Sequence, residues 1–158
     1  MDRKFSILIA AIAILLIVVG AYLIITNQPH GDVSGDDLKI PLKTKNFKLF
    51  KADVPEGSNF KIKNEADGIK YYHNSGKYSS NISGIIINKG LTDSLIGDNS
   101  VSISNSTEEQ IYSYQFKNET AYKLVSNQGD VDVILTGNDL NLLKEISDSI
   151  KIKDADNL

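Results

Sequence analysis

The sequence predicts an α+β fold: an N-terminal transmembrane helix, then a mostly antiparallel β-sheet domain with a C-terminal amphipathic helix packed on one face. Three observations lead to this fold class. Residues 5–26 carry no charged side chain, short runs between residues 46 and 135 alternate apolar and polar positions, and residues 140–150 repeat apolar side chains at helical spacing. These patterns are typical of a membrane span, of strands and of an amphipathic helix, respectively.

The apolar run 5–26 is long enough to cross a bilayer as a helix, because at about 1.5 Å per residue it covers roughly 33 Å of a hydrocarbon core of about 30 Å. Arg3 and Lys4 precede it, which favours a cytoplasmic N-terminus. We therefore expect a cytoplasmic tail (1–4), the transmembrane helix (5–26), a flexible stalk (27–39) and an extracytoplasmic α+β domain (40–158) in a single-pass cell-membrane protein. A cleaved signal peptide is the alternative, and it would also export the domain.

The first part of the domain has the alternation of strands. Residues 46–54, 59–64 and 69–73 predict three of them, separated by a Pro-Glu-Gly turn at 55–57 and an Asp-Gly hairpin turn at 67–68. Residues 78–88 predict a longer strand. Its continuous Ile85-Ile86-Ile87 run fits a central position covered on both faces.

The second part of the domain predicts more strands and a final helix. Residues 91–97 predict a helical turn, residues 100–104 a strand, and residues 106–109 a capping box that starts one or two helical turns. Alternation then predicts strands at 111–116, 120–126 and 131–135. Asn138 or Asp139 caps a helix whose Leu143 and Ile146 share an apolar face, and residues 151–153 form a last short strand. The sum is six to eight antiparallel strands with one clear helix.

Two segments resemble PsbP/Mog1-type domains. One is Val-Pro-Glu-Gly at 54–57, followed by an alternating strand, and the other is the closing helix and strand at 142–152. The whole layout is also similar to small single-span surface proteins of methanogenic archaea. Relatives of the PsbP/Mog1 fold are mostly non-enzymatic partners of larger complexes. The resemblance therefore implies a binding or accessory role, and it transfers no site residue because the matched positions are structural.

No motif in the sequence predicts catalysis or metal binding. The chain has no Cys, and its two histidines, His30 in the stalk and His73 in a strand, are too few for a metal site. Ser58 and Lys61 match S-x-x-K, but positions three apart on a strand face opposite sides. We therefore predict no catalytic, cofactor-binding or metal-binding residue and no enzymatic activity. The net charge of −3 and a lone Arg at Arg3 argue against a nucleic-acid partner.

Tyrosines in the strands are the best candidates for a contact surface, since their rings combine an apolar body with a polar tip. The candidates are Tyr71, Tyr72, Tyr112 and Tyr114. The alternative is that these rings form the amphipathic edge of the core. Three Asn-x-Ser/Thr sequons, at Asn81, Asn105 and Asn118, are candidate glycosylation sites in an exported domain.

These observations predict a membrane-anchored extracytoplasmic module that binds a protein or an envelope polymer through its sheet face. Its other partner is the lipid bilayer, through residues 5–26. One alternative is an accessory subunit of a membrane complex, in which the apolar segment itself makes contacts. A surface hydrolase is the third hypothesis, and it requires a cleft with two facing carboxylates.

Overall fold

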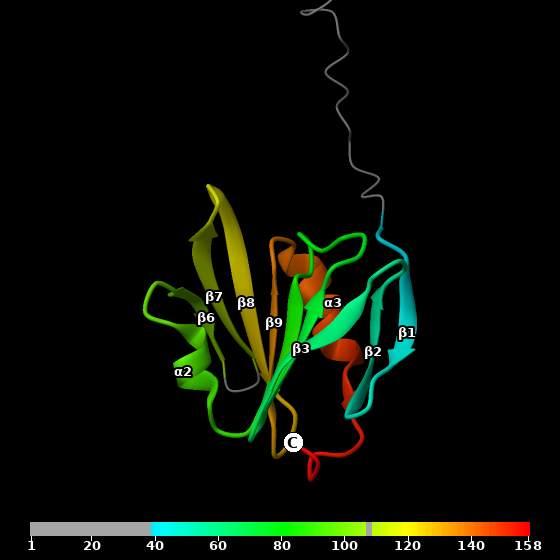
Figure 1. Cartoon of the computed structure of the whole chain (residues 1–158). Helices are drawn as coiled ribbons and strands as arrows, with labels where there is room; N and C mark the ends of the chain where they lie inside the picture. Colours follow the sequence, from blue (N-terminus) through cyan, green and yellow to red (C-terminus); the bar gives the residue numbers. More distant parts are fainter. Residues whose placement is uncertain (1–38, 107–108) are drawn as a thin grey trace, which may run out of the picture. The chain divides into compact units, whose positions relative to one another are not determined.

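Two antiparallel sheets and two short helices form the fold of the described chain. The computed structural model describes residues 39–106 and 109–158, and residues 40–158 form one compact unit (Figure 1). The elements in chain order are β1 (Leu42–Asn46), β2 (Phe50–Pro55), β3 (Phe60–Ala66), β4 (Ile69–Asn74), β5 (Gly84–Asn88), α2 (Thr92–Ile96), β6 (Val101–Asn105), β7 (Glu109–Phe116), β8 (Glu119–Asn127), β9 (Asp132–Gly137), α3 (Leu140–Ser149) and β10 (Lys151–Ile152).

The large sheet has seven strands in the order β3-β4-β5-β9-β8-β7-β6, and the small sheet has the order β1-β2-β10. The pair β5–β9 joins the first half of the chain to the second. In this pair Ile85 lies opposite Leu135 and Ile87 opposite Val133, and all four side chains are fully buried. Because successive strand residues point to opposite faces, these residues assign one face of the large sheet to the core.

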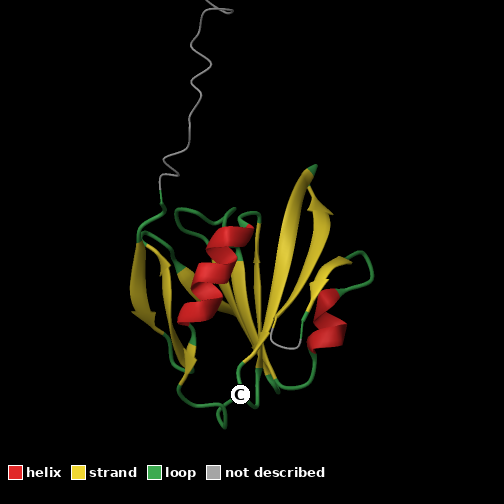
Figure 2. Cartoon of the chain, turned by 180° about the vertical axis from the view of Figure 1, so that it is seen from behind, coloured by secondary structure: helices red, strands yellow, loops and turns green. Residues whose placement is uncertain are grey.

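Helix α3 covers this core face beside the small sheet. Its N-terminus is capped by Asp139, whose carboxylate accepts a hydrogen bond from the Leu142 amide at 3.0 Å. Leu143 and Ile146 are fully buried, and the helix contacts β2, β8 and β9. Figure 2 shows the helix lying on the sheet from this side. On the opposite face of the large sheet, the Lys123 ammonium donates to the carbonyls of Leu95 and Ile96 in the short helix α2.

An aromatic cluster joins the small sheet to the large one. The rings of Phe47 and Phe50 stack with centroids 4.3 Å apart, and Tyr72 meets both edge-on at 5.3 and 5.2 Å. Phe60 meets Phe47 edge-on at 5.8 Å. Offset and edge-on pairs of this kind contribute about 0.5–1.5 kcal/mol each beyond the burial of their area. The cluster therefore fixes the small sheet over the β3–β4 end of the large sheet.

The predicted fold class, α+β with an N-terminal transmembrane helix, is wrong for the described chain. That part of the chain is mostly antiparallel β-sheet, with α2 and α3 as its only helices. None of the helices in residues 39–106 and 109–158 is both long and apolar enough to span a bilayer. The physical reason is that apolar side chains alternate with period two along most of the domain and recur at helical spacing only in α3. The predicted transmembrane segment 5–26, the cytoplasmic tail and nearly all of the stalk lie outside the described residues.

Two predicted strands differ from the structure. The expected strand 46–54 is interrupted, because the amide of Phe47 donates to the carbonyl of Phe50 in a tight turn that separates β1 from β2. The expected strand 78–88 begins only at Gly84. Its first residues form a turn in which Tyr78 has a φ of 64° and its carbonyl accepts from the Ile82 amide. Each turn buries an apolar side chain, Phe47 in the first and Ile82 in the second. In the sequence these residues fit the alternation of a strand, so the turns were predicted as strand.

The capping box predicted at 106–109 does not start a helix. The hydroxyl of Ser106 accepts from the Glu109 amide at 3.0 Å, as an N-cap would, but Glu109 is the first residue of β7. The Ser106 amide also donates to the Glu109 carbonyl. Ser side chains stabilise turns as readily as they stabilise helix starts. The hydrogen bond between the Ser106 hydroxyl and the Glu109 amide therefore closes the β6–β7 hairpin and begins no helix.

The hydroxyl of Tyr72 is buried in the core without a hydrogen-bond partner among the described residues, and the residue is 4% exposed. A buried hydroxyl that gives up its bonds to water lowers stability. We predict that Tyr72→Phe leaves the free energy of unfolding unchanged or raises it by up to about 1 kcal/mol in urea titrations. Tyr112→Phe is the matched control, because the Tyr112 hydroxyl donates to Gln110 at 3.0 Å. A clear loss of stability in Tyr72→Phe alone would contradict the burial of an unpaired hydroxyl.

Candidate functional site

The face of the large sheet opposite α3 is hollowed into a groove of about 690 Å³, called the sheet-face groove below. It lies over β4, β5, β9, β8 and β7, and a loop (75–83) and the β7–β8 hairpin close its sides. The strand residues that line it are Tyr71, His73, Asn74, Ile86, Tyr114, Phe116, Glu119, Ala121, Thr136 and Gly137. Its volume is within the range of about 300–1,000 Å³ that is usual for ligand sites.

Antiparallel register brings the strand residues of the groove together from distant parts of the chain. Tyr71 on β4 lies opposite Ile86 on β5, and Gly84 on β5 lies opposite Thr136 on β9. Their neighbours Tyr72, Ile85 and Leu135 point to the other face and are buried in the core. Period-two alternation therefore divides each strand between the core and the groove.

Gly84 lies directly against the ring of Tyr71, which lines the groove. A Cβ atom at this position would lie 2.5 Å from Cε2 of Tyr71, so only glycine lets the Tyr71 ring lie against the strand. The Tyr71 hydroxyl lies 3.4 Å from Nδ1 of His73, and the two ring centroids are 6.1 Å apart. Burial raises the pKa of Tyr71 above its ordinary value of 10.0. The hydroxyl therefore remains a hydrogen-bond donor at neutral and mildly alkaline pH.

Tyr114 on β7 forms the second aromatic wall, opposite the small side chain of Ala121. The ammonium of Lys123 lies 5.3 Å from the centre of the Tyr114 ring, and it donates to the carbonyls of Leu95 and Ile96 at the end of α2. Burial and then the charge of a Tyr71 phenolate raise the pKa of Tyr114, so the two tyrosines interact electrostatically. Burial lowers the pKa of Lys123.

Hydroxyl groups line the end of the groove next to the loop. The Ser83 hydroxyl donates to the Thr136 carbonyl at 3.0 Å and lies 3.0 Å from the Thr136 hydroxyl. Ser75, Ser79 and Ser80 add three more hydroxyls. Together with the two tyrosines, these side chains offer many neutral donors and acceptors next to aromatic surface.

The loop that carries these serines is held by buried polar contacts. Asn74 is fully buried, and its Oδ1 accepts from the amides of Asn59 and Gly76 at 2.9 and 3.0 Å. Its Nδ2 donates to the Ile82 carbonyl at 2.9 Å. Beside the loop, a Cβ atom on Gly137 would lie 1.9 Å from the carbonyl oxygen of Asn81, so the backbones meet there without room for a side chain. The serines are therefore presented by a fixed loop.

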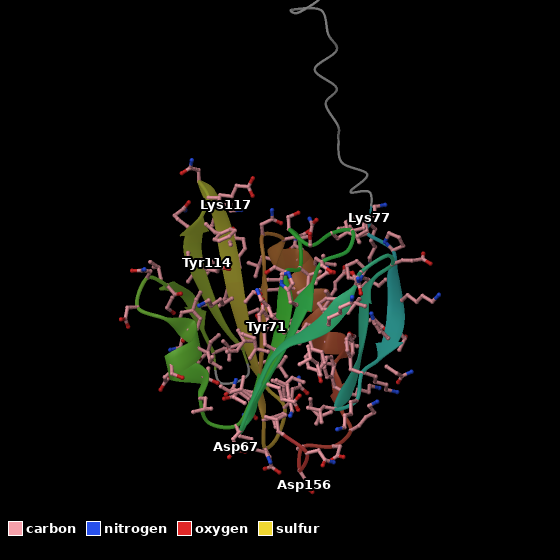
Figure 3. All side chains as sticks on the ribbon, viewed as in Figure 1. Asp67, Tyr71, Lys77, Tyr114, Lys117 and Asp156 are labelled. Atoms are coloured by element: carbon pink, nitrogen blue, oxygen red, sulfur yellow. The ribbon has the colours of Figure 1, made fainter. Side chains whose placement is uncertain are left out.

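The β7–β8 hairpin forms the rim of the groove. Lys117 and Asn118 take φ values of 50° and 67°, which is the backbone of a tight hairpin turn. Phe116 is 57% exposed, and the Lys117 ammonium lies 5.3 Å from the centre of its ring. In Figure 3 Lys117 is at the tip of the hairpin, with Tyr114 below it and Tyr71 nearer the middle of the sheet. Lys117 and Glu119 bring opposite charges to this rim.

Carboxylates are scarce in the groove. Glu119 is the one acid that lines it among the described residues. A smaller cavity of about 180 Å³ contains Asp93, Glu109 and Asp132. There Asp132 accepts hydrogen bonds from Thr92 at 2.6 Å and from Asn127 at 3.0 Å, and residues 39–106 and 109–158 contain no cluster of three metal-ligating side chains. Asp132 therefore serves local hydrogen bonding, and Glu109 pairs with the Lys144 ammonium at 3.9 Å.

The structure separates the four tyrosines that the sequence suggested as a contact surface. Tyr71 and Tyr114 line the groove together. Tyr112 lies on the same face, on β7, but outside the groove, where its hydroxyl donates to Gln110. Tyr72 lies on the other face and belongs to the core. Adjacent residues of one strand cannot share a face, so alternation alone separates Tyr71 from Tyr72.

The three sequons lie in different surroundings. Asn105 is exposed at the end of β6, and Asn118 is exposed at the tip of the β7–β8 hairpin. Asn81 is only half exposed, in the loop beside the groove, where its carbonyl approaches Gly137. A glycan on Asn118 would project from the rim of the groove. Glycosylation of these three residues stays a prediction.

Sequence reasoning missed several residues of the groove. It treated His73 as an isolated ring and assigned Ile86 to a strand covered on both faces, and it gave no role to Phe116 or to the serines of the loop. The alternation that placed Tyr71 on one face also places His73 there, so that signal was present. The loop serines had no such signal, because their position depends on buried contacts of Asn74.

Comparison with protein-family models, curated proteins and solved structures found no match to this chain. The resemblance to PsbP/Mog1-type domains therefore stays a prediction, and the function is argued from the groove itself.

The contact between Gly84 and Tyr71 gives a test of the geometry of the groove. Gly84→Ala places a methyl group 2.5 Å from the Tyr71 ring, and we predict that it lowers the free energy of unfolding by about 1–3 kcal/mol. In the Tyr71→Ala background the same change should have a much smaller effect, because the clash is gone. Urea titrations of the four proteins form a double-mutant cycle. Equal losses in both backgrounds would contradict the placement of the ring.

The raised pKa values of Tyr71 and Tyr114 predict a dependence of stability on pH. The folded state holds these protons more tightly than the unfolded state, whose phenols titrate near the ordinary value of 10.0. Their contribution is therefore fully present below pH 10 and is lost as the pH rises above it. We expect a smaller loss of stability between pH 9 and pH 11 in Tyr71→Phe/Tyr114→Phe than in the parent chain, measured by urea unfolding. An identical loss in both proteins would show that these phenols titrate normally.

Proposed function

We propose that this chain is a non-enzymatic binding module that holds a protein or an envelope component in the sheet-face groove. The observation that carries the proposal is the groove itself, a hollow that combines the aromatic surface of Tyr71, Tyr114 and Phe116 with neutral hydroxyls. Sites of this size with apolar walls and a few fixed polar groups are typical of ligand binding. The apolar run 5–26 and its positive flank support attachment to a lipid bilayer with the domain outside the cytoplasm.

Binding is favoured over hydrolysis by the chemistry of the lining. Glycosidic hydrolysis uses two carboxylates on either side of the scissile bond. Among the described residues that line the groove, Glu119 is alone in carrying a carboxylate, and it is on the exposed rim. The His73 ring lies 3.4 Å from the Tyr71 hydroxyl, and among the described residues no serine hydroxyl is hydrogen-bonded to this pair. The geometry therefore supports recognition through surface contacts.

The test compares two exposed apolar residues of the same sheet. Phe116 is 57% exposed at the groove and Ile103 is 51% exposed on β6, outside it, so truncation of either should leave the core intact. The full chain, reconstituted in lipid nanodiscs, is titrated with washed cell-envelope fragments from its own source. We predict that Phe116→Ala weakens binding by about tenfold, as expected for an aromatic anchor, and that Ile103→Ala stays within about twofold. Equal behaviour of the two variants, or no binding by the parent chain, would contradict the proposal.

A further inference from the structure

The backbone of the groove floor restricts what kind of ligand the groove can hold. Strands β4, β5, β9, β8 and β7 each have a neighbour on both sides in the large sheet. Their backbone amides and carbonyls are therefore hydrogen-bonded to the neighbouring strands. A peptide can form main-chain hydrogen bonds with a free sheet edge, but an extended peptide on this face would find no main-chain partners. A ligand of this groove must satisfy its polar groups through side chains.

The side chains of the groove are suited to a neutral ligand. Its hydroxyls come from two tyrosines, four serines and one threonine, and a hydroxyl can accept as well as donate: Tyr71, Tyr114, Ser75, Ser79, Ser80, Ser83 and Thr136. The fixed charges among the described lining residues are Lys117 and Glu119, which are opposite in sign and lie together on the rim. An anionic or cationic ligand would lose hydration in this groove without a matching excess of charge to compensate.

The aromatic walls add a second requirement, an apolar face on the ligand. Tyr71 and Tyr114 are half-buried and fixed by Gly84 and Lys123, whereas Phe116 is exposed at the rim. The negative face of an aromatic ring attracts polarised C–H groups. Sugar rings present such C–H faces and carry hydroxyls around their edges, so one molecule meets both requirements.

From this combination we infer that the sheet-face groove binds neutral sugar units of an envelope glycan. The inference rests on the proposed binding function and specifies its ligand class. Stacking on Tyr71, Tyr114 and Phe116 would provide the contact area, while the hydroxyls of the loop and of Thr136 would orient the sugar. Both tyrosines are neutral at physiological pH, since even the ordinary phenol pKa of 10.0 lies well above it and burial raises the pKa of both.

The experiment treats the envelope fragments before they are offered to the full chain in nanodiscs. One batch is oxidised with periodate and reduced with borohydride, which destroys sugars that carry vicinal diols, and another is digested with protease. We expect periodate treatment to lower binding of the parent chain at least to the level of Phe116→Ala, and protease digestion to leave the Phe116-dependent binding in place. Binding that survives periodate and disappears with protease would overturn the glycan assignment and leave the binding function standing.

A competition experiment tests neutrality. Oligosaccharides released from the same envelope are divided by anion exchange into a neutral and an acidic pool, and each is added to the parent chain with untreated fragments. The neutral pool should displace the fragments, and the acidic pool at equal sugar concentration should be about tenfold less effective. Equal or better displacement by the acidic pool would overturn the inference. Ile103→Ala should follow the parent chain throughout, whereas failure of every protein to bind untreated fragments would refute the proposed function as well.

Discussion

The packing of Phe47, Phe50 and Tyr72 determines which face of the large sheet is buried. A seven-stranded sheet must cover one apolar face, and here the cover consists of α3 and the small sheet. The stacked and edge-on rings hold the small sheet at the β3–β4 end, whereas α3 packs mainly against β2, β8 and β9. Without these contacts, Ile85 and its neighbours on β4 would lose part of their cover. Alternation then carries this choice of faces along the neighbouring strands, because successive residues of a strand point to opposite faces.

The open face is shaped by small residues as much as by large ones. Gly84 lets the Tyr71 ring lie flat, Ala121 leaves room opposite Tyr114, and Gly137 lets the loop backbone approach the sheet. Gly84 begins β5 and Gly137 ends β9, and neither position contributes a side chain to the packing of the sheet. Two such glycines beside the same hollow fit a surface shaped for contact with another molecule. Asn74 also shapes this face. Its polar side chain is fully buried, where an apolar residue would be usual, and its hydrogen bonds hold the loop in place.

Much of the sheet could be predicted from the sequence, because alternation is a local property. The residues around Tyr71 and Val133 were assigned to strands on that basis, and Asp139, the N-cap of α3, was one of the two caps predicted, with Asn138 as the other. The break at Phe47 could not be predicted, since a buried turn and a strand both place apolar residues at close spacing. The face on which each tyrosine lies relative to the cover is a tertiary property. Alternation separates Tyr71 from Tyr72, but only the packing of the small sheet decides which of the two is buried.

Stability and recognition are separable in this fold because they use different residues of the same strands. Phe116 and the loop serines line the groove and are not members of the buried core cluster, so their substitution changes the surface without opening the core. Gly84 is different, because it affects both. It is next to the fully buried Ile85 on β5, and a side chain at this position would displace the Tyr71 ring that lines the groove. A neutral, face-bound ligand suits this arrangement. Such a ligand needs neither a buried charge nor a free strand edge. The inner strands of the sheet can therefore bind it while all their backbone hydrogen bonds to neighbouring strands stay in place.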